Sequence, residues 1–373
     1  MEEIHQIGVS KNGRVGYGFS DIAVVPQRRT RDPEDVSTKW TIDAYQFDIP
    51  VVGAPMDSAM SPQTVIALGH MGGLGVLDLE GLWTRYEDPS EAFTRIREAT
   101  PENATRVLQE VYAAPIRAEL ITARLAEIRE AGVTVAGSLS PQRTQEFYQT
   151  VLDAGVDLFV IRGTTVSAEH VSTAHEPLNL KKFIYELDVP VIVGGAATYT
   201  AALHLMRTGA AGVLAGFGGG AASQSIRTLG LRMPMATAIA DVAGARRDYM
   251  DESGGRYVHV IADGSLGTAG EIAKAVACGA DAVMLGTALA RAEEAPGGGW
   301  HWGAEARHPS LPRGQRVQVG TVGTLETVLS GPAHDASGQT NLIGSLRKSM
   351  STCGFTDLKE FQKVDVVLSH YES

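Results

Sequence analysis

The residues with the clearest chemical potential stand at the ends of short apolar segments. The segment 211–214 runs into the glycine-rich stretch AGFGGGAASQS, residues 215–225, which then takes on the pattern of a helix start. A run of glycines lets a backbone approach a ligand or an ion closely, so that its amides and carbonyls can contact phosphate or a cation. Ser223 stands where a nucleophile would project from this turn, and a serine hydroxyl needs an adjacent base to react.

Two further segment ends carry a pattern typical of a phosphate site. They are IADGSL at 261–266 and MLGT at 284–287. Asp263 could accept hydrogen bonds from two ribose hydroxyls, and Glu271 opens a helix whose first amides could face an anion. The alternative is that Asp263 only caps a helix and the glycines make tight turns. Because both patterns fall on the last two expected strands, where barrels often bind phosphate, phosphate binding is the favoured interpretation.

The order of the segments predicts one (β/α)8 barrel. Strands are expected at 51–55, 73–79, 133–139, 157–163, 189–195, 212–218, 257–264 and 282–286. Helices are expected between them at 62–70, 114–131, 141–154, 200–208 and 269–278. Eight strands that alternate with helices are the signature of a closed parallel barrel. A doubly wound sheet is the alternative, but its first turn should carry GxGxxG, and none is found there.

The chain is expected to form a single domain of 373 residues. An extended N-terminal arm occupies 1–50, and the glycine- and proline-rich segment 295–314 should be a loop. Residues 315–373 should hold a short flap and C-terminal helices at 342–353 and 357–364.

Composition and charge argue against several classes of protein. The net charge is −11 and no block of lysine and arginine offsets it, which argues against nucleic acid as a partner. No apolar stretch approaches the roughly 18–20 residues that a membrane span needs, and the N-terminus lacks the apolar region of a signal peptide. Cys278 and Cys353 lie far apart, without the spacing of a metal site. A cytoplasmic protein with no membrane partner is expected.

Several collinear motifs give the chain a family resemblance. PVVGAPMDS at 50–58, HMGGLGV at 70–76, VIADG at 260–264 and GSLRKSMSTCG at 344–354 resemble the IMP dehydrogenase/GMP reductase family. The pair of CBS modules that most IMP dehydrogenases insert after the second strand is missing, and a helical stretch at 88–131 fills the space. The resemblance is therefore to the CBS-less, IMP-dehydrogenase-related branch found in some bacteria.

The resemblance implies roles for individual residues. In the family, a cysteine after the sixth strand attacks C2 of IMP, hydride leaves to NAD, and a mobile flap supplies the base for hydrolysis. The substrate-binding positions carried over are Met56, Asp263, Gly264, Ser265, Gly286 and Thr287. The catalytic positions are Ser223 and Ser225, and the cofactor side is Arg162, Gly163, Thr164 and Gly216. Potassium would be held by the backbone carbonyls of Gly218, Gly220 and Ser223.

The departures from the family fall on the reacting groups. Ser223 replaces the nucleophilic cysteine, and Arg162 replaces the acid that would grip the adenosine ribose of NAD. Arginine cannot accept those hydroxyl protons and would suit a phosphate. The flap at 331–338 offers only His334 and Asp335 as acid or base groups, and a solvated loop histidine is the simpler interpretation.

The tryptophans and histidines near the strand ends each allow two interpretations. Trp300, His301 and Trp302 could stack on a base or pack on the barrel rim. His170 and His175 follow the fourth strand and could contact a ligand or face solvent.

Three functions remain open from the sequence. The first is an IMP-dehydrogenase-related enzyme of guanine nucleotide synthesis that binds IMP, XMP or GMP and oxidises IMP to XMP with NAD. The alternative is a purine-nucleotide-binding, regulatory homologue that has lost catalysis, or a GMP reductase-like activity. The resemblance also implies a homo-oligomer, either a tetramer or an octamer.

Overall fold

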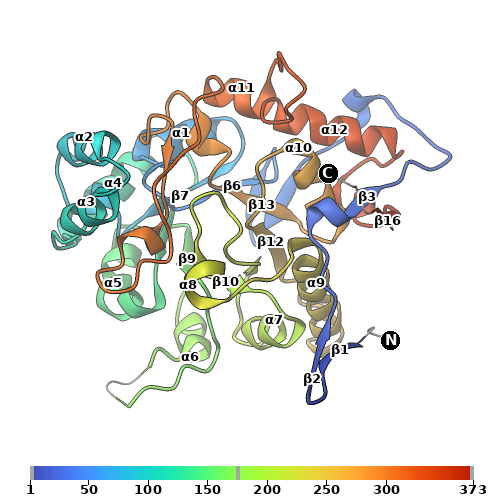
Figure 1. The fold of residues 1–373 in the computed structure, drawn as a ribbon, viewed down its shortest axis with the longest axis horizontal. Helices are drawn as coiled ribbons and strands as arrows, with labels where there is room; N and C mark the ends of the chain where they lie inside the picture. The colour runs from blue at the N-terminus through green and yellow to red at the C-terminus, as the bar shows by residue number, and fades with distance from the viewer. Residues whose placement is uncertain (1–3, 174–176, 370–373) are drawn as a thin grey trace.

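The computed structural model describes residues 4–173 and 177–369, and its centre is a closed barrel (Figure 1). Neighbouring barrel strands follow the chain order, and the last strand closes against the first. The strands are β6 Val51–Gly53, β7 Leu74–Asp78, β8 Ala136–Leu139, β9 Leu158–Arg162, β10 Val191–Ala196, β11 Gly212–Ala215, β12 His259–Asp263 and β13 Ala282–Leu285. Seven of them lie within the expected segments and β10 extends one residue past its segment, to Ala196, so the (β/α)8 barrel is confirmed.

The barrel strands form where short runs of valine, isoleucine, leucine and alanine can be buried on both faces. Parallel strands covered by helices outside and by side chains inside read as continuous apolar runs, as these do. The register places Asp263 beside Met284 and Val283 beside Val51. Asp263, at the end of β12, therefore lies at the same rim of the barrel as the turn after β13.

Several of the covering helices begin at a residue whose side chain caps the first turn. Ser61 caps α1 Pro62–His70 by accepting from the Thr64 amide at 3.1 Å. At α10 Ala269–Ala277, Thr268 and Glu271 form a reciprocal capping box. The other helices are α2 Ser90–Glu98, α3 Ala104–Val111, α4 Ala118–Glu130, α5 Pro141–Asp153, α6 Leu180–Tyr185, α7 Tyr199–Met206, α8 Ser225–Leu229, α9 Met235–Glu252, α11 Leu325–Ser330, α12 Leu342–Thr352 and α13 Leu358–Phe361.

The longest of these helices, α9, was not among the expected ones. It has 18 residues, and its buried face includes Ala236, Ala238 and Ala245 beside Ile239 and Val242. Alanine contributes little to hydrophobic periodicity, so a face built largely from alanine gives a weak signal. The helix follows the glycine-rich turn and packs against α7 and β12.

Two segments have more structure than the sequence predicts. The N-terminal arm contains the hairpin β1 Ile4–Gly8 and β2 Lys11–Arg14, which projects beside α9 (Figure 1). The expected loop at 295–314 contains β14 Trp300–His301, which pairs with β15 Val317–Gln318. In the segment 295–314, the glycine-rich composition concealed a short pairing whose partner strand lies further along the chain.

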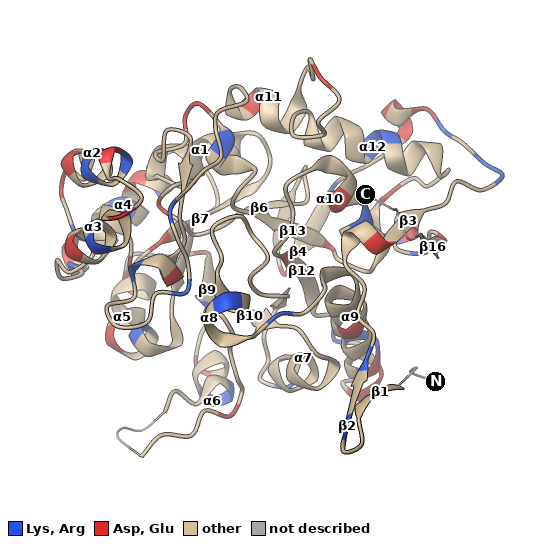
Figure 2. Cartoon of the chain, in the orientation of Figure 1, with Lys and Arg blue, Asp and Glu red and all other residues tan. Residues whose placement is uncertain are grey.

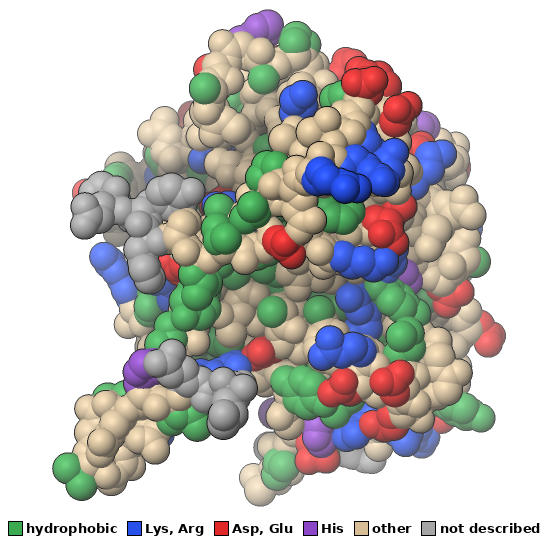
Figure 3. Space-filling view, turned by 90° about the vertical axis from the view of Figure 1, so that its right-hand side faces the viewer, with side chains coloured by type: hydrophobic (Ala, Val, Ile, Leu, Met, Phe, Trp, Pro, Cys, Tyr) green, Lys and Arg blue, Asp and Glu red, His purple; other side chains and the backbone are tan. Residues whose placement is uncertain are grey.

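A strand of the N-terminal arm pairs with a strand near the C-terminus on one side of the barrel. The strand β3 Ile22–Val24 pairs with β16 Val366–Leu368, and the Val25 amide donates to the Asp365 carbonyl at 2.9 Å. A separate hairpin joins β4 Trp40–Ile42 to β5 Tyr45–Phe47. The pairing of β3 with β16 joins the arm to the C-terminal region on the right-hand side of Figure 1, the side that faces the viewer in Figure 3.

Charged residues of both signs are interspersed over the outer helices (Figure 2). In that view no continuous basic face is seen, which agrees with the net charge of −11. Within the described part of the chain, no helix combines the length and the apolar character that a membrane crossing requires.

Candidate functional site

A cavity of about 60 Å³ lies at the carboxyl ends of the barrel strands. Ten residues expected from the sequence line it: Met56, Arg162, Gly218, Gly220, Ser223, Asp263, Gly264, Ser265, Gly286 and Thr287. The other lining residues are Ala54, Ala222, Leu266, Met284, His301, Gly303 and Glu305. Four of the expected residues are not part of this lining, namely Gly163, Thr164, Gly216 and Ser225. The fold thus gathers positions more than 200 residues apart in sequence around one small space.

An ion pair crosses the mouth of the barrel inside this cavity. Arg162 ends β9 and Asp263 ends β12. The Nε atom of Arg162 donates to Oδ2 of Asp263 at 2.9 Å, and Nη2 donates to Oδ1 at 3.3 Å. Only 14% and 12% of the two side chains are exposed. The arginine expected to face a cofactor and the acid expected to face a ribose are therefore each other's partners in this structure.

The electrostatics of Arg162 favour this pairing. Burial by itself lowers the pKa of Arg162, but the charges of Asp263 and Glu305 raise it more, so the net pKa lies above its ordinary value. A guanidinium that donates two parallel hydrogen bonds to one carboxylate is among the strongest charge pairs in proteins. A ligand that needs Asp263 must compete with this pair.

The glycine-rich turn after β11 is held in place by backbone hydrogen bonds. The Ser223 amide donates to the Gly220 carbonyl at 3.0 Å. The Gln224 amide donates to the Arg313 carbonyl at 2.8 Å, and the Gln315 amide donates to the Ala222 carbonyl at 2.9 Å. The segment around residues 313–315 therefore fixes the turn from the outside.

Ser223 itself has no base beside it. Its hydroxyl lies 3.4 Å from the Ser225 hydroxyl and 3.5 Å from the Ser225 amide. Among the described residues, no histidine, lysine or carboxylate forms a hydrogen bond with the Ser223 hydroxyl. A hydroxyl without a general base is a poor nucleophile at neutral pH.

The turn after β12 and the glycine-rich turn lie against each other. The Ser265 hydroxyl donates to the Gly219 carbonyl at 3.1 Å. Gly264 has a φ of 132°, and a Cβ atom there would collide with the Gly218 carbonyl oxygen. Glycine is required at this position both by its backbone conformation and by the close approach of the second turn. The expected phosphate cradle and the expected nucleophile loop form one packed unit.

The three carbonyls expected to hold potassium belong to the glycine-rich turn, and two of them lie against neighbouring backbone. The Gly220 carbonyl accepts the Ser223 amide, and the Gly218 carbonyl lies directly against Gly264. Each carbonyl oxygen keeps a second lone pair, so potassium at these three positions stays a prediction from the family resemblance. Within 4–173 and 177–369, no group of three or more histidine, cysteine or acidic side chains could hold a metal.

The residues expected on the cofactor side are also engaged with the protein. The Gly163 amide donates to the Gly194 carbonyl at 2.9 Å, and the Gly216 amide donates to the Ala196 carbonyl at 2.6 Å. The Thr164 hydroxyl is buried without a hydrogen-bond partner. No carboxylate stands at the end of β9 to accept from ribose hydroxyls, so these residues do not fit the adenosine ribose of NAD.

One wall of the cavity comes from the segment that contains β14, which the sequence left open. His301 lines the cavity, and its Nδ1 lies 2.9 Å from the Ser58 hydroxyl. Burial, followed by the charge of Arg291, lowers the pKa of His301 to about 4, so the ring is neutral near pH 7. Trp302 is 1% exposed and packs on Phe93, with ring centroids 6.1 Å apart. For Trp302, packing on the rim is the observed arrangement.

A buried polar cluster behind this wall was not expected from the sequence. The Tyr112 hydroxyl donates to Oδ2 of Asp57 at 2.6 Å and accepts from the Trp302 indole at 2.9 Å. Arg307 donates to Asp78 at 3.1 Å. Burial, with the nearby charge of Asp78, raises the pKa of Asp57 to about 7. Asp57 follows the first barrel strand and Asp78 ends the second. These positions at strand ends were the sequence signal that could have predicted the cluster.

The remaining candidate residues lie away from the cavity. His334 and Asp335 are exposed in the segment before α12, and Asp335 accepts from the Ser337 amide at 2.9 Å. His170 is exposed, and His175 lies outside the described residues.

The structure is a closed (β/α)8 barrel, and the turns after its last three strands line one cavity at the end where barrel enzymes carry their active sites. Residues 16–306 match the IMP dehydrogenase / GMP reductase domain. The chain therefore belongs to the IMP dehydrogenase/GMP reductase family. Residues 79–135, between β7 and β8, are all described and form α2, α3 and α4 instead of a CBS pair.

Similar proteins cover nearly the whole chain. A Mycobacterium tuberculosis protein named an uncharacterized oxidoreductase, Rv3410c, is 54% identical over 374 residues, which is 97% of this chain and 99% of the relative. A crystal structure of an IMP dehydrogenase/GMP reductase-like protein from Corynebacterium glutamicum has a TM-score of 0.94 and 49% identity, and covers 98% of each chain. The inosine-5′-monophosphate dehydrogenase of Methanocaldococcus jannaschii is 25% identical over 466 residues, 93% of this chain and 91% of that protein.

Proposed function

We propose that the protein binds a purine mononucleotide at the barrel mouth without running the covalent dehydrogenase step. The phosphate would lie against Gly264, Ser265, Gly286 and Thr287, and the ribose hydroxyls would face Asp263. One observation carries the proposal: the cavity brings these groups together around a serine hydroxyl that has no base. Family membership supports the ligand class, because this family acts on purine mononucleotides.

Binding would require the ion pair between Arg162 and Asp263 to open. Ligand cavities usually measure roughly 300–1,000 Å³, and this one encloses about 60 Å³. A ribose can replace the guanidinium by donating two hydroxyl hydrogen bonds to Asp263. The released Arg162 would then be free to pair with an anionic group of the ligand or with Glu305, which lines the same cavity.

Calorimetric titration of the whole protein with IMP, XMP and GMP tests the proposal. We expect saturable binding of at least one of them, weakened by at least about tenfold, or ~1.4 kcal/mol, in Asp263→Ala. The matched control is Asp251→Ala, which removes an exposed acid near the end of α9 and should leave the affinity unchanged. Failure of all three nucleotides to bind, or equal affinity in Asp263→Ala, would overturn the proposal.

Oxidation of IMP to XMP with NAD is the second candidate function. It is favoured by the oxidoreductase name of the mycobacterial relative, 54% identical to this chain. The assay follows the absorbance of the reduced cofactor with IMP and NAD, and separately with GMP and NADPH for reductase activity. Turnover that disappears in Ser223→Ala would favour the second candidate over the first.

A further inference from the structure

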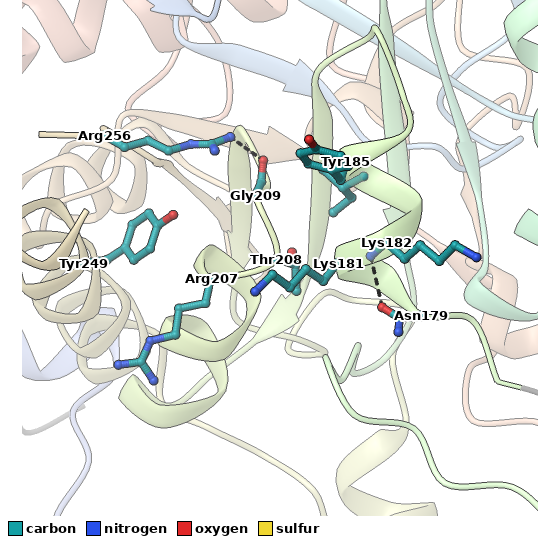
Figure 4. A pocket seen from close by; sticks show the side chains of 10 residues that line it. Asn179, Lys181, Lys182, Tyr185, Arg207, Thr208, Gly209, Tyr249 and Arg256 are labelled. Atoms are coloured by element: carbon teal, nitrogen blue, oxygen red, sulfur yellow. Dashed lines mark hydrogen bonds between the residues drawn. The ribbon is translucent and has the colours of Figure 1, made fainter. Parts of the chain in front are cut away.

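A second, larger cavity lies at the opposite end of the barrel. It encloses about 630 Å³ and is lined by α6, by the Arg207–Thr208–Gly209 segment after α7, and by Tyr249 and Arg256 (Figure 4). Gly209 precedes β11 and Arg256 precedes β12, so the cavity lies where these strands begin. The candidate site lies where they end. The two cavities are therefore separate, and the larger one has no part in the proposed function.

The lining of this cavity is cationic. Among the described residues, the lining includes Lys181, Lys182, Arg207 and Arg256 and contains no carboxylate. The chain as a whole has a net charge of −11. The lining of this cavity, with four cations, therefore has the opposite sign of charge to the protein as a whole. A concave surface lined by one sign of charge concentrates ligands of the opposite sign.

The acids near the cavity neutralise only two of its cations. Arg207 pairs with Glu252 at 2.6 Å, and Lys182 lies 4.0 Å from Glu186. Figure 4 shows Lys182 and Arg207 extending away from the centre of the cavity. Lys182 and Arg207 therefore each form an ion pair with an acid at the edge of the cavity.

The other two cations remain available to a ligand. In the described ranges, no carboxylate forms an ion pair with Lys181 or Arg256. The Arg256 guanidinium donates from Nη2 to the Gly209 carbonyl at 2.5 Å, which holds it at the wall. Lys181 extends toward the segment after α7 (Figure 4). Two cations on separate segments, one of them held at the wall, suit a ligand that carries more than one anionic group.

An exposed aromatic ring completes the lining. Tyr185, at the end of α6, is 90% exposed, whereas Tyr249 on the other side of the cavity is buried. A large exposed ring beside cationic groups offers a stacking surface for a planar base. The cavity volume lies within the roughly 300–1,000 Å³ that small-molecule sites usually enclose.

We propose that this cavity binds a nucleoside polyphosphate. The phosphates contact Lys181 and Arg256, and the base stacks on Tyr185. The inference does not depend on the nucleotide site at the barrel mouth, because no residue lines both cavities.

The test is a titration of the whole protein with ATP, with Lys181→Glu compared with Lys182→Glu. Both lysines are exposed and adjacent on one helix, and the two substitutions change the net charge equally. We expect Lys181→Glu to weaken ATP binding by at least about tenfold and Lys182→Glu to change it by less than about twofold. Equal losses in the two variants, or no saturable binding of ATP by the unmodified protein, would overturn the proposal.

A second comparison tests the base contact. Tyr185→Ala should weaken ATP binding but leave the affinity for inorganic tripolyphosphate unchanged. If tripolyphosphate binds the unmodified protein as tightly as ATP, the cavity is a simple polyanion site and the nucleoside assignment is wrong. Asp263→Ala, which acts at the barrel mouth, should leave ATP binding at Lys181 unchanged, so failure of one proposal is distinguishable from failure of the other.

Discussion

Arg162 and Asp263 join the fourth and seventh strands of the barrel across its mouth, with the guanidinium donating to both carboxylate oxygens. Both side chains are largely buried. The pair places a cation where a cofactor acid would stand in a related dehydrogenase, and it occupies the acid that a ribose would need. It therefore bears on binding, on catalysis and on stability at once.

The first prediction concerns the stability of this pair. Arg162→Met should lower the free energy of unfolding by about 2 kcal/mol, because it leaves the Asp263 carboxylate buried without a partner. Denaturant unfolding measures this loss. The double variant Arg162→Met with Asp263→Asn should regain much of it, since no unpaired charge remains. A double variant as unstable as the sum of the two single variants would show that the pair contributes no coupling.

The second prediction concerns the pH dependence of stability at Asp57. Its pKa in the folded protein is about 7, against 3.8 ordinarily, so the folded state retains the proton over that range while the unfolded state loses it. The contribution of Asp57 to stability should therefore be present below pH 4 and decline as the pH rises toward 7. The slope is up to ~1.4 kcal/mol per pH unit. Unfolding of Asp57→Asn across this range isolates the contribution by difference.

His301 should contribute in the opposite direction. Burial lowers its pKa from 6.5 to about 4, so the unfolded state binds the proton first as the pH falls. Its contribution to stability should be complete above pH 6.5 and decline as the pH falls toward 4. His301→Gln should flatten the acid side of the stability curve. His308→Gln, at a more exposed histidine that does not line the cavity, is the control.

The close contact between the two turns predicts the effect of a single added methyl group. Gly264→Ala should abolish nucleotide binding and lower stability by about 1–3 kcal/mol, because φ is positive and Cβ collides with the Gly218 carbonyl. Gly230→Ala is a matched control, since Gly230 has a φ of +70° with no atom within 4 Å of the added Cβ. Its cost should be about 1 kcal/mol, without loss of binding. Equal binding losses in the two variants would contradict the role of the contact.

The last prediction concerns the nucleophile position. Ser223→Cys should introduce a thiol that reacts with an alkylating reagent, because Ser223 lines the cavity. It should give no turnover with IMP and NAD, since Arg162 still stands where an acid would bind the cofactor ribose. Mass spectrometry measures the first effect, and the absorbance of the reduced cofactor measures the second. Turnover by the single variant would show that the cofactor side works with an arginine in place.

The sequence alone determined the architecture and most of the cavity wall. Apolar runs bounded by glycine and proline predicted all eight strands, because burial on both faces of a parallel strand demands such runs. Strand ends meet at one rim, so motifs at those ends predicted that Ser223, Asp263 and Thr287 would lie together, and the family resemblance added Met56. Family motifs fixed the identity of the fold independently of this argument.

Only the tertiary structure decided which of these groups are free. The pairing of Arg162 with Asp263, and of Tyr112 with Asp57, joins residues 101 and 55 positions apart. The charged cavity beside α6 likewise assembles residues from four elements. Sequence patterns report how a segment is buried along its own length, whereas a hydrogen bond or an ion pair depends on the distance between side chains that the closed barrel sets.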